Sequence, residues 1–232
     1  MSIAFNGTSS RIAFPLAAFN DERTVPRSVS AMVYFSGAKS GTIKGYSVVS
    51  SKKTTGTIAG FEIGLLWTGT ILAPNNKLLC YIQIDNNFVA NNRISHIGAT
   101  DLLASTWYTF TATYDGSSTA AGTKLYINGV QETPTVTVNA LSASIISDAA
   151  ANIGARNSAA EWFNGRIANV GIWNVELTAA EVASLAKGVA VDHVRPQSLV
   201  LATPMIRDVT DKKGGALTAT NTTVADHPRI YL

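Results

Sequence analysis

The 232-residue chain contains one cysteine, Cys80, so it can form no disulfide within itself. The place of Cys80 in an alternating apolar run is typical of a small strand residue and not of a reactive thiol. Charged residues make up only 14% of the chain, and the 18 Lys and Arg are scattered along it. A net charge of +3 spread in this way gives no concentrated basic face, and we predict no nucleic-acid partner.

Long hydrophobic runs are also missing, although 46% of the residues are hydrophobic. No stretch approaches the roughly 18 apolar residues of a membrane helix, so we predict no membrane partner. The first residues, 1–8, lack the basic and apolar segments of a signal peptide. We therefore expect synthesis in a cytoplasm without secretion.

Sequence patterns of catalysis are missing as well. The chain has three histidines but no Gly-x-Ser-x-Gly motif and no phosphate-binding glycine loop. Glu62 and Glu161 stand alone, so no acid pair at strand spacing predicts a glycosidase, although carboxylates distant in sequence can converge in space. We predict that the protein is not an enzyme, with a glycoside hydrolase or lyase as a second alternative.

What the chain does contain is a series of short β-rich runs between clusters of Gly, Asn, Ser and Pro. Apolar residues occupy alternate positions in 28–35, 61–67, 78–84 and 107–114, which is typical of strands buried on one face. Asn128-Gly129 predicts a two-residue type I′ hairpin turn. The series indicates an antiparallel sandwich and not βαβ units.

One helix is predicted near residues 178–187. Thr178 and Glu181 have the spacing of a capping box, an apolar stripe follows, and Gly188 is a typical stop. Beyond it, prolines recur and exclude a central strand at their positions. We predict a domain over residues 1–188 and an extended C-terminal arm over 189–232 that packs on the domain or on a neighbouring subunit.

Three segments carry a resemblance to a known family: Trp107-Tyr-Thr-Phe-Thr-Ala-Thr-Tyr-Asp-Gly116, Lys124-Leu-Tyr-Ile-Asn-Gly-Val130 and Phe163-Asn-Gly-Arg-Ile-Ala-Asn-Val-Gly-Ile-Trp173. In order and residue type they resemble the laminin-G-like, concanavalin A-like jelly-roll family. The resemblance implies an all-β sandwich of two antiparallel sheets with one short helix and the extended arm. Trp107 and Trp173 match family positions that pack against the sandwich, so we expect both in the core.

The arm resembles the C-terminal extension of laminin-G-like proteins in tailed-phage and prophage structural clusters, through Arg195-Pro-Gln-Ser-Leu-Val200, Lys213-Gly-Gly-Ala-Leu-Thr218 and Ala225-Asp-His-Pro-Arg-Ile-Tyr231. This resemblance implies a non-enzymatic virion component: a capsid decoration protein, head fibre or tail-associated module, made in the bacterial cytoplasm and located in the virion. Its partners would be other virion proteins and further copies of itself, because an arm with free edge hydrogen bonds can add a strand to a neighbour. The assembly residues are predicted to be Arg195, Pro196, His227, Pro228, Arg229 and Tyr231.

The alternative function is a lectin-like module that recognises host surface polysaccharide. Sugar sites stack a flat aromatic on the sugar ring, while amides and guanidinium groups bind its hydroxyls. Trp162 follows a polar segment that contains Arg156 and Asn157, and Trp67 closes its strand. These four residues are the carbohydrate-binding candidates.

Calcium is the cofactor that the family resemblance implies, because many laminin-G-like domains hold one at the sandwich rim through Asp, Asn and backbone oxygens. The candidate ligands are Asp85 and Asp115, with Asn86 and Asn87 beside the first. The family, however, commonly carries acids where this chain has Ala168 and Asn169, and Asp115-Gly116 also reads as a plain turn. We therefore predict no cofactor, with calcium as the alternative.

Overall fold

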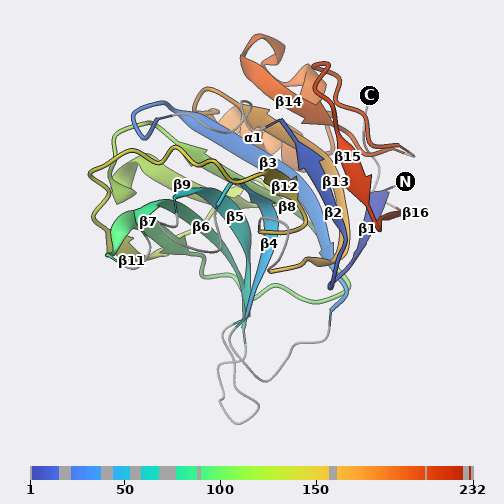
Figure 1. Ribbon diagram of the computed structural model, residues 1–232, viewed down its shortest axis with the longest axis horizontal. Helices are drawn as coiled ribbons and strands as arrows, with labels where there is room; N and C mark the ends of the chain where they lie inside the picture. Colours follow the sequence, from blue (N-terminus) through green and yellow to red (C-terminus); the bar gives the residue numbers. More distant parts are fainter. Residues whose placement is uncertain are drawn as a thin grey trace.

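The computed structural model describes residues 2–15, 22–37, 44–52, 59–67, 77–87, 90–156, 161–206, 208–226 and 230. Two antiparallel β-sheets pack face to face, and a helix with part of the C-terminal arm lies on the outer face of one of them (Figure 1). The predicted all-β jelly-roll sandwich of two antiparallel sheets with one helix is confirmed.

Among the described residues, each sheet has eight strands. In spatial order, sheet A contains β10 (Val130–Gln131), β9 (Thr123–Ile127), β8 (Trp107–Tyr114), β3 (Arg27–Phe35), β13 (Asn164–Trp173), β1 (Ser2–Asn6) and β16 (Thr223–Ala225), and β14 (Leu199–Thr203) also pairs with β13. Sheet B contains β11 (Thr135–Asn139), β7 (Asn92–Ile97), β6 (Leu78–Asn87), β5 (Gly60–Trp67), β4 (Lys44–Ser50), β12 (Ala151–Ile153), β2 (Arg11–Phe14) and β15 (Thr218–Thr220). The four predicted strands correspond to β3, β5, β6 and β8.

The main core lies between the sheets and is built from alternate strand residues, as the sequence pattern predicts. Trp173 is also fully buried, but on the other side of sheet A, where its indole Nε1 donates a hydrogen bond to the carbonyl of Val194 at 2.7 Å. The expectation for Trp107 is corrected. Its side chain is half-buried on the outer face of sheet A, opposite Tyr34 in the register.

The hairpin and helix signals describe local structure accurately. Asn128 and Gly129 both have positive φ, 50° and 80°, as a type I′ turn requires. Helix α1 (Ala179–Ala186) begins with the capping box, in which Glu181 N–H donates to Thr178 and the Glu181 carboxylate accepts from Thr178 N–H. It ends before Gly188. Among the described residues, no helix is long and apolar enough to span a membrane.

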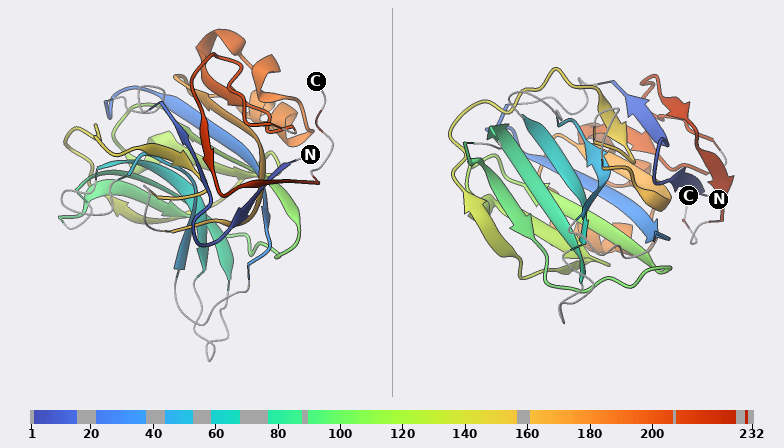
Figure 2. Two further views of the ribbon diagram at one scale, coloured as in Figure 1. Left: turned by 45° about the vertical axis from the view of Figure 1, so that its right-hand side comes forward. Right: turned by 60° about the horizontal axis from the view of Figure 1, so that its bottom comes forward.

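The described part of the arm packs on its own chain. After the 3-10 helices η3 (Val191–His193) and η4 (Pro196–Ser198), β14 pairs with β13, β15 with β2 and β16 with β1. The first and last described strands, β1 and β16, therefore lie side by side (Figure 2). A further 3-10 helix, η2 (Ala120–Gly122), precedes β9. The arm thus completes both sheets of the sandwich.

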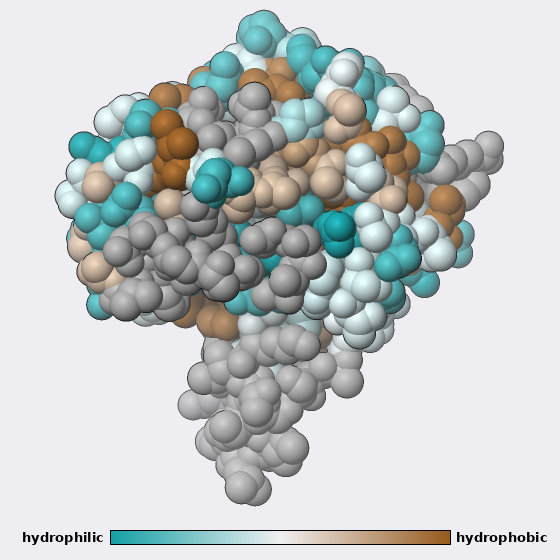
Figure 3. All heavy atoms as spheres, viewed as in Figure 1, coloured by the Kyte–Doolittle hydropathy of each residue, from teal (hydrophilic) through white to brown (hydrophobic). Residues whose placement is uncertain are grey.

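The surface visible in Figure 3 mixes polar and apolar residues. Among its coloured residues, hydrophobic areas are small and interrupted by hydrophilic ones. This pattern agrees with a chain in which few residues are charged but many are small and polar. The coloured residues in this view therefore form no broad apolar surface that would indicate a partner.

One buried histidine sets a pH dependence of stability. His96 lies opposite Ile82 in the register, its side chain is 3% exposed, and neither ring nitrogen has a hydrogen-bond partner among the described residues. Burial holds its pKa below the ordinary 6.5. The unfolded chain therefore binds a proton at His96 more readily than the folded chain does. The stability contributed by keeping His96 neutral is fully present above pH 6.5 and is lost as the pH falls through the folded-state pKa.

We expect His96→Phe to remove this part of the acid sensitivity. Wild type should lose up to about 1.4 kcal/mol of unfolding free energy per pH unit below pH 6.5 from this residue, and the variant should not. Urea unfolding between about pH 5 and pH 8 measures both slopes. His193→Gln, at an exposed histidine, is the matched control and should keep the wild-type slope. Identical slopes in wild type and His96→Phe would refute this account.

Candidate functional site

A cluster of buried charges lies on the outer face of sheet B. Glu62 on β5 pairs with Gln83 on β6, and its chain neighbours Phe61 and Ile63 point into the core, so Glu62 points outwards. Lys52, which follows β4, places its Nζ 2.6 Å from Asp85 Oδ2 and 3.5 Å from Glu62 Oε2. The side chains of all three ionic residues are 0% exposed, so they depend on one another for charge compensation.

Arg156 extends this cluster towards solvent. Its Nε and Nη2 donate to Glu62 Oε2 at 3.0 and 2.7 Å, and Nη2 lies 2.7 Å from Glu161 Oε2. The Tyr81 hydroxyl donates to the same Glu161 oxygen at 3.4 Å. Arg156 and Glu161 are 15% and 25% exposed, whereas Glu62 is closed to solvent. Arg156 therefore connects a buried carboxylate to an accessible one.

The two carboxylates have opposite pKa shifts. Burial alone would raise the pKa of Glu62, but the charges of Arg156 and Lys52 outweigh it and hold that pKa below its ordinary value. Burial and the neighbouring negative charge of Glu62 raise the pKa of Glu161 to about 7. The accessible carboxylate therefore changes charge near neutral pH.

Two glycines on adjacent strands leave space for this arrangement. A Cβ on Gly45 would lie 2.8 Å from Glu161 Oε2, and a Cβ on Gly64 would lie 2.8 Å from the Tyr81 ring. Side chains at these positions would displace the carboxylate and the phenol. The sheet surface is thus shaped to hold Tyr81 and Glu161 close to its backbone.

The polar groups border a cavity of about 270 Å³. Its lining residues are Gly45, Leu66, Tyr81, Gln83, Ile97, Arg156 and Glu161. This volume is just below the usual range of about 300–1,000 Å³ for small-molecule sites, and the mixture of a few placed polar groups with apolar walls is typical of such sites. We call this cavity the sheet B pocket.

The structure brings one predicted carbohydrate-binding residue, Arg156, into the sheet B pocket. Trp162 is half-buried and directly follows Glu161, but it does not line the pocket. Trp67 is 3% exposed and belongs to the main core, which corrects its assignment as a surface stacking residue. Asn157 lies outside the described residues.

The calcium candidates have other partners. A cation at Asp85 would have to displace the ammonium of Lys52. Asp115 is exposed, and its Oδ1 accepts a hydrogen bond from Ser117 N–H at 2.7 Å, as in a turn. Among the described residues, no group of three or more His, Cys, Asp or Glu side chains is placed to hold a metal ion.

The assembly residues of the arm are only partly described. Arg195 has a φ of 46°, and its Nε lies 2.6 Å from Glu181 Oε1 on α1 of the same chain. Pro196 is exposed at the start of η4. The other four predicted assembly residues lie outside the described residues: His227, Pro228, Arg229 and Tyr231.

Sequence reasoning assigned no site role to Lys52, Tyr81 and Gln83, and it named Glu161 only as an acid that stands alone in sequence and could converge in space with another carboxylate. Alternation along β5 and β6 did carry a signal, because Glu62, Tyr81 and Gln83 are out of phase with the core residues of those strands. It could not show that Arg156 and Glu161, from a distant segment, lie over the same face.

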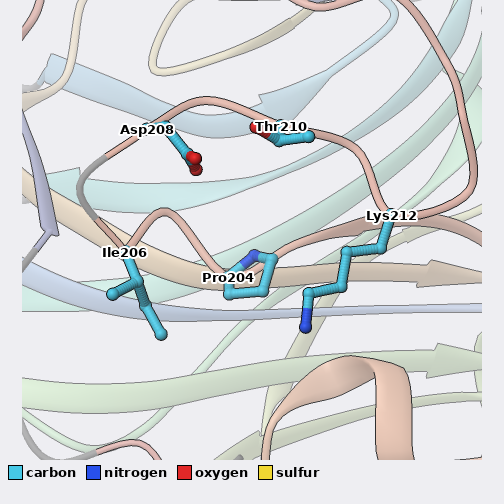
Figure 4. A pocket seen from close by; sticks show the side chains of 5 residues that line it. All are labelled: Pro204, Ile206, Asp208, Thr210 and Lys212. Carbon is cyan, nitrogen blue, oxygen red and sulfur yellow. The ribbon is translucent and has the colours of Figure 1, made fainter.

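A second cavity lies in the arm, after β14. It has a volume of about 280 Å³ (Figure 4). Its lining residues are Pro204, Ile206, Asp208, Thr210 and Lys212. Lys212 Nζ is 2.6 Å from Asp192 Oδ2, so this ammonium is already paired. The lining comes from one loop, which contrasts with the several strands that build the sheet B pocket.

The family of the chain follows from its match to a family profile. A family profile described as the concanavalin A-like lectin/glucanases superfamily, Laminin_G_3, matches residues 6–183. The chain belongs to this superfamily. A search of curated proteins gives no match.

Solved structures of the same fold include proteins named for carbohydrate binding. A putative carbohydrate-binding protein from Bacteroides ovatus is 17% identical with a TM-score of 0.61; the match covers 100% of this chain and 62% of that chain. The heptameric SAP-like pentraxin from Limulus polyphemus is 13% identical with a TM-score of 0.60 and 94% coverage of both chains. Domain 4 of AbnA, a GH43 extracellular arabinanase from Geobacillus stearothermophilus, in complex with arabinotriose, is 19% identical with a TM-score of 0.50, covering 79% of this chain and 75% of that one. At these identities the likeness shows the fold alone.

Proposed function

We propose that the protein is a glycan-binding module whose binding site is the sheet B pocket. The observation that carries this proposal is the position of the Arg156 guanidinium. It pairs on one side with the buried Glu62 and on the other with Glu161, whose carboxylate is accessible from the pocket. Structures of the same fold that are named for carbohydrate binding or contain arabinotriose support the proposal.

The pocket offers groups that match a sugar. The Glu161 carboxylate can accept hydrogen bonds from two hydroxyls, and Gln83 has an amide nitrogen to donate because its Oε1 accepts from Lys52 Nζ at 2.6 Å. Leu66 and Ile97 supply apolar wall for the C–H face of the ring. Because the ion pairs and the two glycines already fix the polar groups, little ordering is required on binding.

The same geometry favours binding over hydrolysis. Glu62 Oε2 and Glu161 Oε2 lie 2.7 Å from one nitrogen of Arg156, close enough together to suggest a glycosidase pair. Glu62, however, is 0% exposed, and both of its oxygens accept from Arg156 Nε. A carboxylate held in this way cannot reach a glycosidic bond as nucleophile or general base.

Assembly into a virion through the arm stays a prediction. Each of the strands β14, β15 and β16 pairs with one strand of the same chain, and β15 and β16 lie at the ends of their sheets, with one edge unpaired among the described residues. The sheet B pocket, where side chains from several strands border one cavity, carries the proposed function.

A glycan array with the full chain tests the proposal. Wild type should bind at least one neutral or bacterial surface glycan, and Glu161→Gln should weaken that binding by about tenfold or more, about 1.4 kcal/mol. Because the pKa of Glu161 is about 7, wild-type affinity should fall as the pH drops below about 7, and that of Glu161→Gln should not. Calorimetric titration measures both effects.

Glu176→Gln is the matched control, since Glu176 pairs with Lys124 on the other sheet. It should bind as wild type does. Trp162→Ala decides whether the neighbouring predicted residue contributes. A wild type that binds no glycan on the array, or a Glu161→Gln variant that binds with unchanged affinity, would rule out the sheet B pocket as a glycan site.

A further inference from the structure

A row of side chains crosses the outer face of sheet A, on the opposite side of the molecule from the sheet B pocket. Arg166 of β13 lies opposite Tyr34 of β3 in the register, and Tyr34 lies opposite Trp107 of β8. The Arg166 guanidinium is 5.0 Å from the centre of the Tyr34 ring, and the Tyr34 and Trp107 ring centres are 5.5 Å apart with an interplanar angle of 52°. All three side chains are half-buried.

A small cavity of about 160 Å³ continues this row towards α1. Trp107 and Thr109 form one wall, and Lys187 and Gly188 at the end of the helix form another. Asn128 also lines it. Its Oδ1 accepts from Thr109 N–H at 2.9 Å, which leaves the amide nitrogen to donate to a ligand. We call the row together with this cavity the sheet A site.

The charges of the sheet A site are positive. Within the described part of the chain, Arg166 and Lys187 form no ion pair with a carboxylate; Arg166 Nη1 instead donates to the Asp226 backbone carbonyl at 3.3 Å. Two other cations, Lys124 and Arg195, are compensated by carboxylates 2.7 and 2.6 Å away. The site thus presents aromatic rings between two uncompensated cations.

We propose that the sheet A site binds an acidic saccharide, a chain of uronic-acid-type sugars. The cavity is below the usual range of about 300–1,000 Å³ for whole small-molecule ligands, so it takes part of one sugar, while the chain continues past Trp107 towards Arg166. Trp107 lines the cavity and offers a ring face for sugar stacking, whereas the Tyr34 ring packs against Arg166 and Trp107. Arg166 and Lys187 pair with sugar carboxylates. A single-stranded nucleic acid is disfavoured, because this short row lacks the basic groove that follows a phosphate backbone.

The inference is independent of the proposed function, because the two sites lie on different sheets. The probes are short oligogalacturonides, with neutral galacto-oligosaccharides and a single-stranded DNA oligomer for comparison. Calorimetry and Trp fluorescence on the full chain measure binding at low and high salt. Wild type should bind the acidic oligosaccharide, more weakly at high salt. The Glu161→Gln variant, in which the sheet B pocket is weakened, should bind the neutral oligosaccharide at least about tenfold more weakly than the acidic one.

The variants separate this site from the rest of the surface. Trp107→Ala should weaken oligogalacturonide binding by about tenfold or more, and Lys187→Gln and Arg166→Gln by several-fold each. Lys187 is exposed, so Lys187→Gln tests the site even where Trp107→Ala fails to fold. The matched controls are Lys124→Gln, a paired cation of sheet A, and Glu161→Gln in the sheet B pocket; both should bind the acidic probe as wild type does.

Four results would each overturn the proposal: no saturable binding of oligogalacturonides by wild type, equal affinity of the Glu161→Gln variant for the acidic and the neutral oligosaccharide, tighter binding of the DNA oligomer, or unchanged affinity in Lys187→Gln and Arg166→Gln. A loss of neutral-glycan binding in Glu161→Gln, with oligogalacturonide binding intact, would support two separate sites. Failure of the sheet B pocket to bind any glycan would leave this test unaffected.

Discussion

Replacing Glu62 with alanine is expected to lower the free energy of unfolding by about 3–5 kcal/mol, although no catalytic role is assigned to this residue. The carboxylate lies between Lys52 and Arg156, at 3.5 and 2.7 Å, and is 0% exposed. Its removal leaves two cations on a surface that water scarcely reaches, with only Asp85 and Glu161 to compensate them. Urea unfolding at neutral pH measures the loss.

A surface ion pair provides the control for this prediction. In the Lys124–Glu176 pair, the two side chains are 39% and 27% exposed, so Glu176→Ala should cost no more than about 1 kcal/mol. Glu62→Gln keeps the shape but loses the charge, and its cost should lie between the two. If Glu62→Ala is as mild as Glu176→Ala, the buried cluster does not hold Arg156 in place.

The two tryptophan corrections show how far strand alternation can predict a site. Trp67 is in phase with Phe61 and Ile63, which are core residues, so its pattern already placed it inside. Trp107 is out of phase with Phe110, and its pattern placed it outside. The position of Trp67 at the end of its strand and the match of Trp107 to a family core position were weaker guides than the two-residue period of the strands.

The sheet B pocket, in contrast, could not have been predicted from local pattern. Glu62 reads as an isolated exposed acid, because an outward position on a strand is usually solvated. Burial comes from Lys52 and Arg156, which are ten and 94 residues away in sequence and reach Glu62 only when the strands of sheet B are in register. Such a site depends on tertiary pairing, which no spacing of acids along one strand encodes.

Removing residues 190–232 is expected to leave a chain that no longer folds cooperatively. Leu201 and Met205 are 0% exposed in the main core, and Val191 and Leu199 pack in the second core around Trp173. Each such side chain contributes about 1.5–3 kcal/mol on burial, so their joint loss is comparable to the 5–15 kcal/mol that stabilises an ordinary domain.

Near-ultraviolet circular dichroism and urea unfolding of the truncated chain measure this loss. A chain lacking only residues 227–232 is the control, because it keeps every strand that the structure describes, and it should unfold as wild type does. A chain ending at residue 189 that unfolds cooperatively within about 1 kcal/mol of wild type would show that the arm is dispensable for the fold. In that case β14, β15 and β16 could leave their own sheets to pair with a neighbouring subunit. If the truncated chain unfolds instead, the fold requires the arm. An arm exchanged between subunits would then have to be replaced, in the same positions, by the arm of another copy.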